Sequence, residues 1–79
     1  MVYPNPFSDF ALLEFSNPSN EIFTLGIYDV NGKLINEISG ITSGRVQINR
    51  KNLQAGMYFY MLRNTDGKRI ARGKLLVVN

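Results

Sequence analysis

Apolar and polar residues alternate with a period of two along most of this 79-residue chain. The segments that follow the alternation are residues 10–16, 22–30, 45–49 and 57–63, and residues 74–78 form a short, nearly continuous apolar run. β-Branched and aromatic side chains fill these segments, and no helical stripe of ten or more residues occurs, so the pattern indicates β-strands. The residues predicted to face a hydrophobic core are Leu25, Ile27, Val46, Ile48 and Leu62.

Glycine-containing turns separate the strand-like segments. Asn31-Gly32 and Asp66-Gly67 each lie between two of them and predict two-residue hairpins, because both pairs suit positive φ angles. Polar breaks are expected within residues 16–20 and 39–44. With residues 3–7 as an additional edge strand, the chain has about seven strands at roughly ten-residue spacing. This predicts an all-β fold, a small antiparallel immunoglobulin-like β-sandwich of two sheets.

Residues 49–56 (NRKNLQAG) are too polar to continue a strand and too long for a tight hairpin. We expect them to carry the chain from one sheet to the other, with Gly56 in a backbone geometry awkward for other residues. Tyr58 follows where sandwich folds often place a corner tyrosine, whose hydroxyl bonds to backbone a few residues upstream. The alternative is that Tyr58 is only a half-buried strand aromatic.

The composition removes most catalytic chemistry. Without histidine or cysteine, the chain has no Ser-His-Asp, Cys-His or zinc site. Its six carboxylates are scattered near turns and on polar strand faces, and a domain this small leaves no room for a substrate cleft around a pair of them. Glycine-rich phosphate-binding motifs are missing, and a hairpin explains residues 29–32 better than a calcium loop does. We expect no enzyme, metal or cofactor.

The net charge of +3 is mild, but five of the nine basic residues fall in the last predicted hairpin. They are Arg63, Lys68, Arg69, Arg72 and Lys74. Basic residues interleaved with aromatics can bind single-stranded nucleic acid. Because the charge is modest and the neighbouring aromatics alternate as core residues do, a solvated or partner-docking face is the better interpretation. No run approaches a membrane span of ~20 apolar residues, and the pattern of the first residues predicts no signal peptide here.

Four short motifs occur in one fixed order: YPNPF, IYDVNGK, LQAGMY and GKLLV. Each is unspecific alone, but together they resemble the C-terminal sorting domain of type IX secretion cargo, the type A group, over essentially the whole chain. The motif positions of that family fall on Pro4, Asn5, Pro6, Gly56, Tyr58, Gly73, Lys74, Leu75 and Val77. Many family members end in a basic residue, whereas this chain ends in Asn79.

The resemblance implies a non-catalytic secretion signal that is a fragment of a larger exported protein of a Gram-negative bacterium. Residues 1–79 would be one domain, with the cargo N-terminal to it. The implied partners are the outer-membrane type IX translocon and a sortase-like protease that removes the domain, so that the cargo is secreted or attached at the cell surface. An immunoglobulin-like structural spacer and a carbohydrate-binding module of an extracellular enzyme are the alternatives.

Two further expectations concern the ends of the chain. Residues 73–78 are apolar and terminal, so we expect a recognition strand at a sheet edge that offers unpaired backbone to a partner. Lys74 would supply a charge to the docking surface or only guard against aggregation. At the other end, the prolines would keep residues 3–7 extended while removing two backbone donors, with Tyr3 and Phe7 as anchors.

Overall fold

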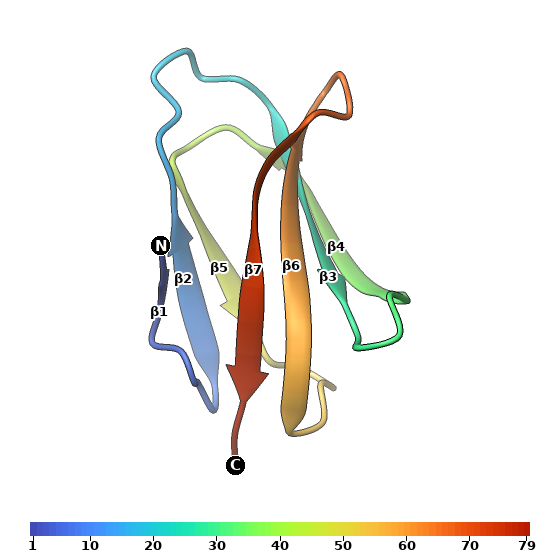
Figure 1. The fold of residues 1–79 in the computed structure, drawn as a ribbon. Helices are drawn as coiled ribbons and strands as arrows, with labels where there is room; N and C mark the ends of the chain where they lie inside the picture. Colours follow the sequence, from blue (N-terminus) through green and yellow to red (C-terminus); the bar gives the residue numbers. More distant parts are fainter.

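Seven β-strands and no helix make up the computed structural model, which describes all 79 residues (Figure 1). The strands are β1 (Val2–Tyr3), β2 (Phe10–Glu14), β3 (Phe23–Tyr28), β4 (Leu34–Ile41), β5 (Arg45–Asn49), β6 (Gly56–Asn64) and β7 (Arg69–Val77). The structure has no helix that is long and apolar enough to cross a membrane. The all-β class and the number of strands are as the sequence predicts.

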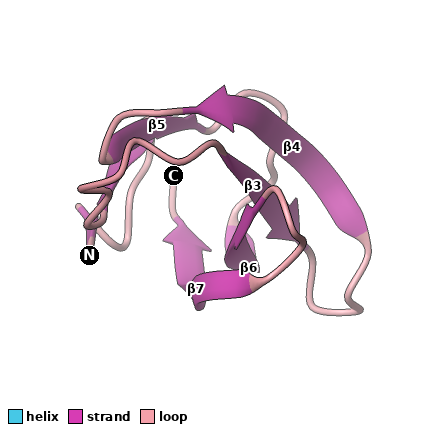
Figure 2. Ribbon diagram, turned by 90° about the horizontal axis from the view of Figure 1, so that it is seen from above, coloured by secondary structure: helices cyan, strands magenta, loops and turns pink.

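The strands form two antiparallel sheets, ordered β1-β2-β5 and β4-β3-β6-β7. Viewed from above, β5 lies on one side of the molecule and β6 and β7 lie on the other (Figure 2). Residues 50–55 lead from β5 in the first sheet to β6 in the second, which confirms the predicted crossing. A single parallel bridge between Phe7 and Val77 joins the N-terminal segment to the outer edge of β7.

One hydrophobic cluster fills the space between the sheets. Its members are Phe7, Ala11, Leu13, Phe23, Leu25, Ile27, Ile41, Val46, Ile48, Leu53, Tyr60, Leu62, Leu75 and Val77. All five core residues predicted from the alternation are buried, because a strand with one buried face sends every second side chain inward. Leu53 was not predicted, since it lies in a polar connection where no alternation marks it.

Both glycine-containing hairpins have three-residue loops, so the prediction of two-residue turns is wrong. In each loop the glycine N–H donates to the carbonyl three residues earlier, and only the glycine, Gly32 (φ 82°) or Gly67 (φ 78°), has a positive φ. The side chains of Asp29 and Asn64 explain the difference, because each accepts hydrogen bonds from the N–H groups two and four residues ahead. These bonds favour a type I turn closed by a glycine bulge.

Two strands extend further than their sequence patterns predict. β4 continues through residues 39–41, so the predicted break is confined to residues 42–44. Gly40, with φ 70°, lies where the register between β3 and β4 shifts, and the glycine therefore forms a bulge within the strand rather than an end. β7 begins at Arg69, five residues before the apolar run. Its first half is basic, so the apolar pattern does not mark it, but it still pairs with β6.

Glu14, Tyr3 and Arg45 form a polar cluster where β1, β2 and β5 lie side by side. The nearby Tyr3 hydroxyl and the Arg45 guanidinium, 3.1 Å from Glu14 Oε2, hold the pKa of Glu14 below its usual value. The Glu14 carboxylate in turn raises the pKa of Tyr3. The stability that Glu14 contributes is therefore present above its unfolded-state pKa and is lost as the pH falls through the lower folded-state pKa. Solvent exposure keeps this contribution small.

Candidate functional site

Three segments far apart in the sequence lie together at the end of the molecule that holds the C-terminus (Figure 1). They are residues 4–7, 56–58 and 73–78, and we call this region the C-terminal corner. In the β6–β7 pair, Gly56 lies opposite Val77 and Tyr58 opposite Leu75. The corner thus contains all nine positions that the sequence motifs single out, although the motifs are separated by up to about 50 residues of chain.

Asn5 and Phe7 fasten the N-terminal segment to the outer edge of β7. Asn5 Nδ2 donates to the Lys74 carbonyl at 2.9 Å, and Asn5 Oδ1 accepts from the Leu76 N–H at 3.0 Å. The Phe7 N–H donates to the Leu76 carbonyl and the Phe7 carbonyl accepts from the Val78 N–H, both at 2.9 Å. A side-chain amide carries the same donor and acceptor as a peptide group, so Asn5 here replaces one residue of a neighbouring strand.

This arrangement corrects the expectation that the terminal strand offers a free backbone edge. β7 is the edge strand of its sheet, as predicted, but Lys74, Leu76 and Val78 already bond to residues 5 and 7. Before Lys74, β7 pairs with β6 only. Pairing of a partner strand in register with the whole of residues 73–78 would first require the N-terminal segment to leave.

The proline segment bends rather than running extended. Residues 4–6 lie outside any strand, both proline peptide bonds are cis, and the three side chains are exposed. Phe7 is 2% exposed and anchors the segment in the core as expected, whereas Tyr3 is 39% exposed and does not. The sequence could not separate the two rings, because only the tertiary contact with β7 turns Phe7 inward.

Tyr58 forms the predicted corner. Its hydroxyl donates to the carbonyl of Gln54, four residues upstream, at 2.7 Å, while its ring packs against the core. Gly56, between the two residues, has φ 153°, a backbone conformation that favours glycine. The space around a Cβ at this position is open, so the backbone conformation, and not crowding, explains why glycine stands there.

Replacing Tyr58 with phenylalanine is expected to lower the free energy of unfolding by about 1 kcal/mol, because the Gln54 carbonyl loses its partner while the ring stays in place. Urea denaturation followed by circular dichroism would measure the loss. Tyr58→Leu, which also removes the ring, should cost more. An unchanged free energy of unfolding in Tyr58→Phe would show that only the ring contributes.

Arg50 contacts the C-terminal corner, and the sequence did not indicate this role. Its guanidinium donates to the carbonyls of Leu53 (2.9 Å), Val78 (3.2 Å) and Ser8 (3.4 Å) and to Asn79 Oδ1 (2.9 Å). One half-buried side chain therefore holds the residue 50–55 connection, the N-terminal segment and the C-terminus together. The one feature of the sequence that could have indicated this role is the residue type, because among polar side chains only arginine presents five donors in a fixed plane.

The nine motif residues divide by exposure. Pro4, Asn5, Pro6 and Lys74 are exposed, whereas Leu75 and Val77 are buried in the core. Gly73 is half-buried. The exposed members lie at one end of the fold and include no group of side chains that could hold a metal ion. Such a surface is suited to contact with another macromolecule, and the buried members give it a fixed shape.

Comparison with known proteins agrees with this geometry. Residues 1–78 match the sequence model of the family described as "Secretion system C-terminal sorting domain". No curated protein matches the chain. The match covers nearly the whole fold, including every strand and the complete C-terminal corner. The chain therefore belongs to the family of C-terminal sorting domains of the type IX secretion system.

Proposed function

We propose that this domain directs a cargo, joined to it on the N-terminal side, across the outer membrane of a Gram-negative bacterium, and that the type IX translocon recognises the C-terminal corner. The observation that supports the proposal is the meeting of the three motif segments at one end of the fold. Two hydrogen bonds of Asn5 join the first segment to the last, and the β6–β7 pairing joins the second to the last. Residues brought together from positions 4 to 78 form one surface only in the folded domain. The signal is therefore a shape rather than a linear peptide.

Within the corner, the buried and exposed residues have different roles in this proposal. Leu75 and Val77 keep the end of β7 in the core, and Tyr58 locks the turn before β6. Pro4, Pro6 and Lys74 face solvent and make the contacts with the translocon. Lys74 supplies the charge in this group, and a lysine ammonium is a compact donor for a carboxylate or a carbonyl of the partner.

A sortase-like protease then removes the domain, and the cargo is released or attached at the cell surface. A protease binds its substrate as an unpaired, extended segment, and at the start of this domain β1 is already paired with β2. The Glu14 N–H donates to the Met1 carbonyl at 2.8 Å, and Val2 lies opposite Leu13. We therefore place the cleaved bond in the chain that precedes β1.

The direct test is a fluorescent protein that carries a cleavable inner-membrane signal at its N-terminus and residues 1–79 at its C-terminus. It would be expressed in a bacterium with a type IX system and in a matched strain without the translocon. Fluorescence at the cell surface or in the medium of the first strain only is the expected result. Retention in the periplasm of both strains, with the domain folded, would contradict the proposal.

A second pair of fusions tests the corner itself. Lys74→Ala removes the exposed charge beside Asn5, and Lys68→Ala removes a lysine that is also exposed, at the opposite end of the β6–β7 hairpin. We expect the Lys74→Ala fusion to accumulate in the periplasm and the Lys68→Ala fusion to be exported normally. Circular dichroism would establish that both domains are folded. Equal export of the two fusions would show that Lys74 only guards the strand against aggregation.

A further inference from the structure

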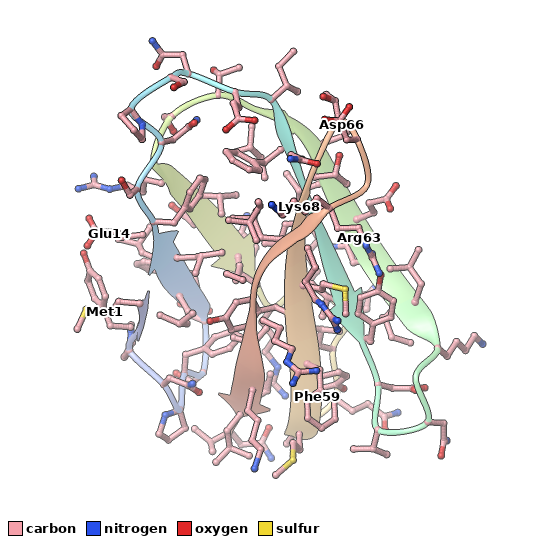
Figure 3. The ribbon with its side chains drawn as sticks, turned by 45° about the horizontal axis from the view of Figure 1, so that its top comes forward. Met1, Glu14, Phe59, Arg63, Asp66 and Lys68 are labelled. Atoms are coloured by element: carbon pink, nitrogen blue, oxygen red, sulfur yellow. The ribbon has the colours of Figure 1, made fainter.

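The outer face of the β4-β3-β6-β7 sheet contains a groove of about 590 Å³ beside the β3–β4 hairpin. It lies on the solvent side of β6 and β7, away from the core. Figure 3 shows Phe59 near the lower end of β6 and Arg63 near its upper end, with Met1 and Glu14 on the other side of the molecule. The groove is separate from the proline segment, and Gly73 and Lys74 are the motif residues that it shares with the C-terminal corner.

The floor of the groove is apolar. Phe59 and Met61 of β6 lie opposite Tyr28 and Gly26 of β3, on the face that Tyr60 and Leu62 do not use. Phe59 is 37% exposed, and Met61 and Tyr28 are half-buried. Because Gly26 has no side chain, the Tyr28 ring lies across it and forms part of the floor.

Three cations border this floor: Arg63, Arg72 and Lys74. Lys74 lies opposite Phe59 and Arg72 opposite Met61 in the β6–β7 register, so each cation stands beside an apolar floor residue. Arg63 Nη1 donates to the Tyr28 hydroxyl at 2.8 Å, which holds its guanidinium at the upper border.

The groove has one acidic lining residue, Asp29. Its Oδ1 already accepts the Asn31 and Lys33 N–H groups, so this carboxylate stabilises its own hairpin. The one salt bridge of the chain joins Arg45 to Glu14. The three bordering cations therefore have no ion pair within the protein. The groove therefore presents uncompensated positive charge beside exposed apolar surface.

We propose that this groove binds an acidic segment of a partner protein, with an apolar side chain on Phe59 and Met61 and carboxylates on Arg72 and Lys74. Charge complementarity identifies the partner as acidic. The floor identifies it as a protein, because flexible methionine side chains adapt to aliphatic and aromatic residues. Single strands of nucleic acid instead need successive exposed rings for stacking. Of the two rings in this floor only Phe59 is exposed, because the half-buried Tyr28 ring lies across Gly26.

A second copy of this chain does not fit the groove. Its six carboxylates never occur next to each other in the sequence, and two such domains would bring basic surfaces together. The proposal rests on the proposed function, since a partner of the export machinery is the occupant that a sorting domain would meet. It adds a second contact surface, on a different face from the proline segment.

The binding test uses the isotope-labelled 79-residue domain and a synthetic peptide in which aspartates alternate with leucine and phenylalanine. We expect the peptide to shift the amide resonances of Phe59, Met61 and Arg72, with an affinity that falls as salt is added. Arg72→Glu should weaken binding by about tenfold or more, whereas Arg69→Glu, the same charge change outside the groove, should have a smaller effect. Tighter binding of oligothymidine or of a sulfated polysaccharide to these residues would overturn the proposal, as would no binding of the peptide.

The same variants in the fluorescent fusion separate the two proposals. If the unmodified fusion is not exported, the proposed function fails regardless of the peptide result. If it is exported and the Arg72→Glu fusion leaves the cell as fast as the Arg69→Glu fusion, the groove is not used and only the present inference fails. Slower export of Arg72→Glu alone, with both domains folded, supports the groove as a contact surface.

Discussion

Replacing Leu25 with alanine is expected to lower the free energy of unfolding by about 2–5 kcal/mol. Leu25 is fully buried in β3 and lies between Ile38 of β4 and Leu62 of β6. Removing three carbons there leaves a cavity that strand neighbours on both sides prevent from closing. The whole stability of a small domain is about 5–15 kcal/mol, and at 79 residues with no disulfide this one is expected at the low end. A large part of the molecules should then be unfolded at 37 °C.

Leu34→Ala is the matched control for this prediction. Leu34 begins β4 in the same sheet but is 46% exposed, so its truncation creates no cavity and should cost much less. Thermal and urea denaturation of both variants, followed by circular dichroism, would measure the difference. Similar losses in the two variants would mean that the centre of β3 can repack, contrary to the burial seen here.

The second large effect is expected at Gly73. This residue lies opposite Tyr60 in the β6–β7 pair, and the Tyr60 ring covers it. A Cβ at Gly73 would stand 2.6 Å from Tyr60 Cε2 and 2.7 Å from its hydroxyl oxygen. Tyr60 is only 9% exposed, so its ring cannot turn into solvent. Gly73→Ala should therefore cost about 1–3 kcal/mol of unfolding free energy through overpacking.

A double-mutant cycle tests this explanation. In a Tyr60→Leu background the same Gly73→Ala change meets no ring, and its cost should fall by about 0.5–3 kcal/mol. Gly26→Ala provides a comparison, because the Tyr28 ring covers Gly26 in the same way but lies half-buried on the outer face and can move. An equal cost of Gly73→Ala with and without the Tyr60 ring would show that the glycine is required for another reason.

The sequence singled out the members of the candidate site but did not predict their contacts. Motif positions in the sequence identified Asn5 and Lys74, and the structure joins them through the Lys74 carbonyl. Nothing local predicts that bond, because its partners are 69 residues apart. Arg50 was missed for the same reason, since its acceptors at Ser8 and Val78 come from both ends of the chain.

In the hairpins, the sequence predicted the position of each turn but not the length of its loop. Asn31-Gly32 and Asp66-Gly67 correctly mark where the chain reverses. The loop length depends instead on the residue just before each turn, Asp29 or Asn64, whose side chain accepts two backbone N–H groups. Asparagine and aspartate favour such local bonds, so this correction can be applied to other sequences.

By itself, the sequence determined the β class, the faces of the strands and the central residues of the core, because strand alternation and turn chemistry act over a few neighbouring residues. It also suggested the corner role of Tyr58, and the structure decided it with an acceptor only four residues away. Tertiary structure alone decided how the edge of β7 is covered, which aromatic ring of residues 3–7 is buried, and that basic and apolar residues of β3, β6 and β7 form one groove. These features depend on contacts between distant segments, which arise only when the two sheets pack on a shared core.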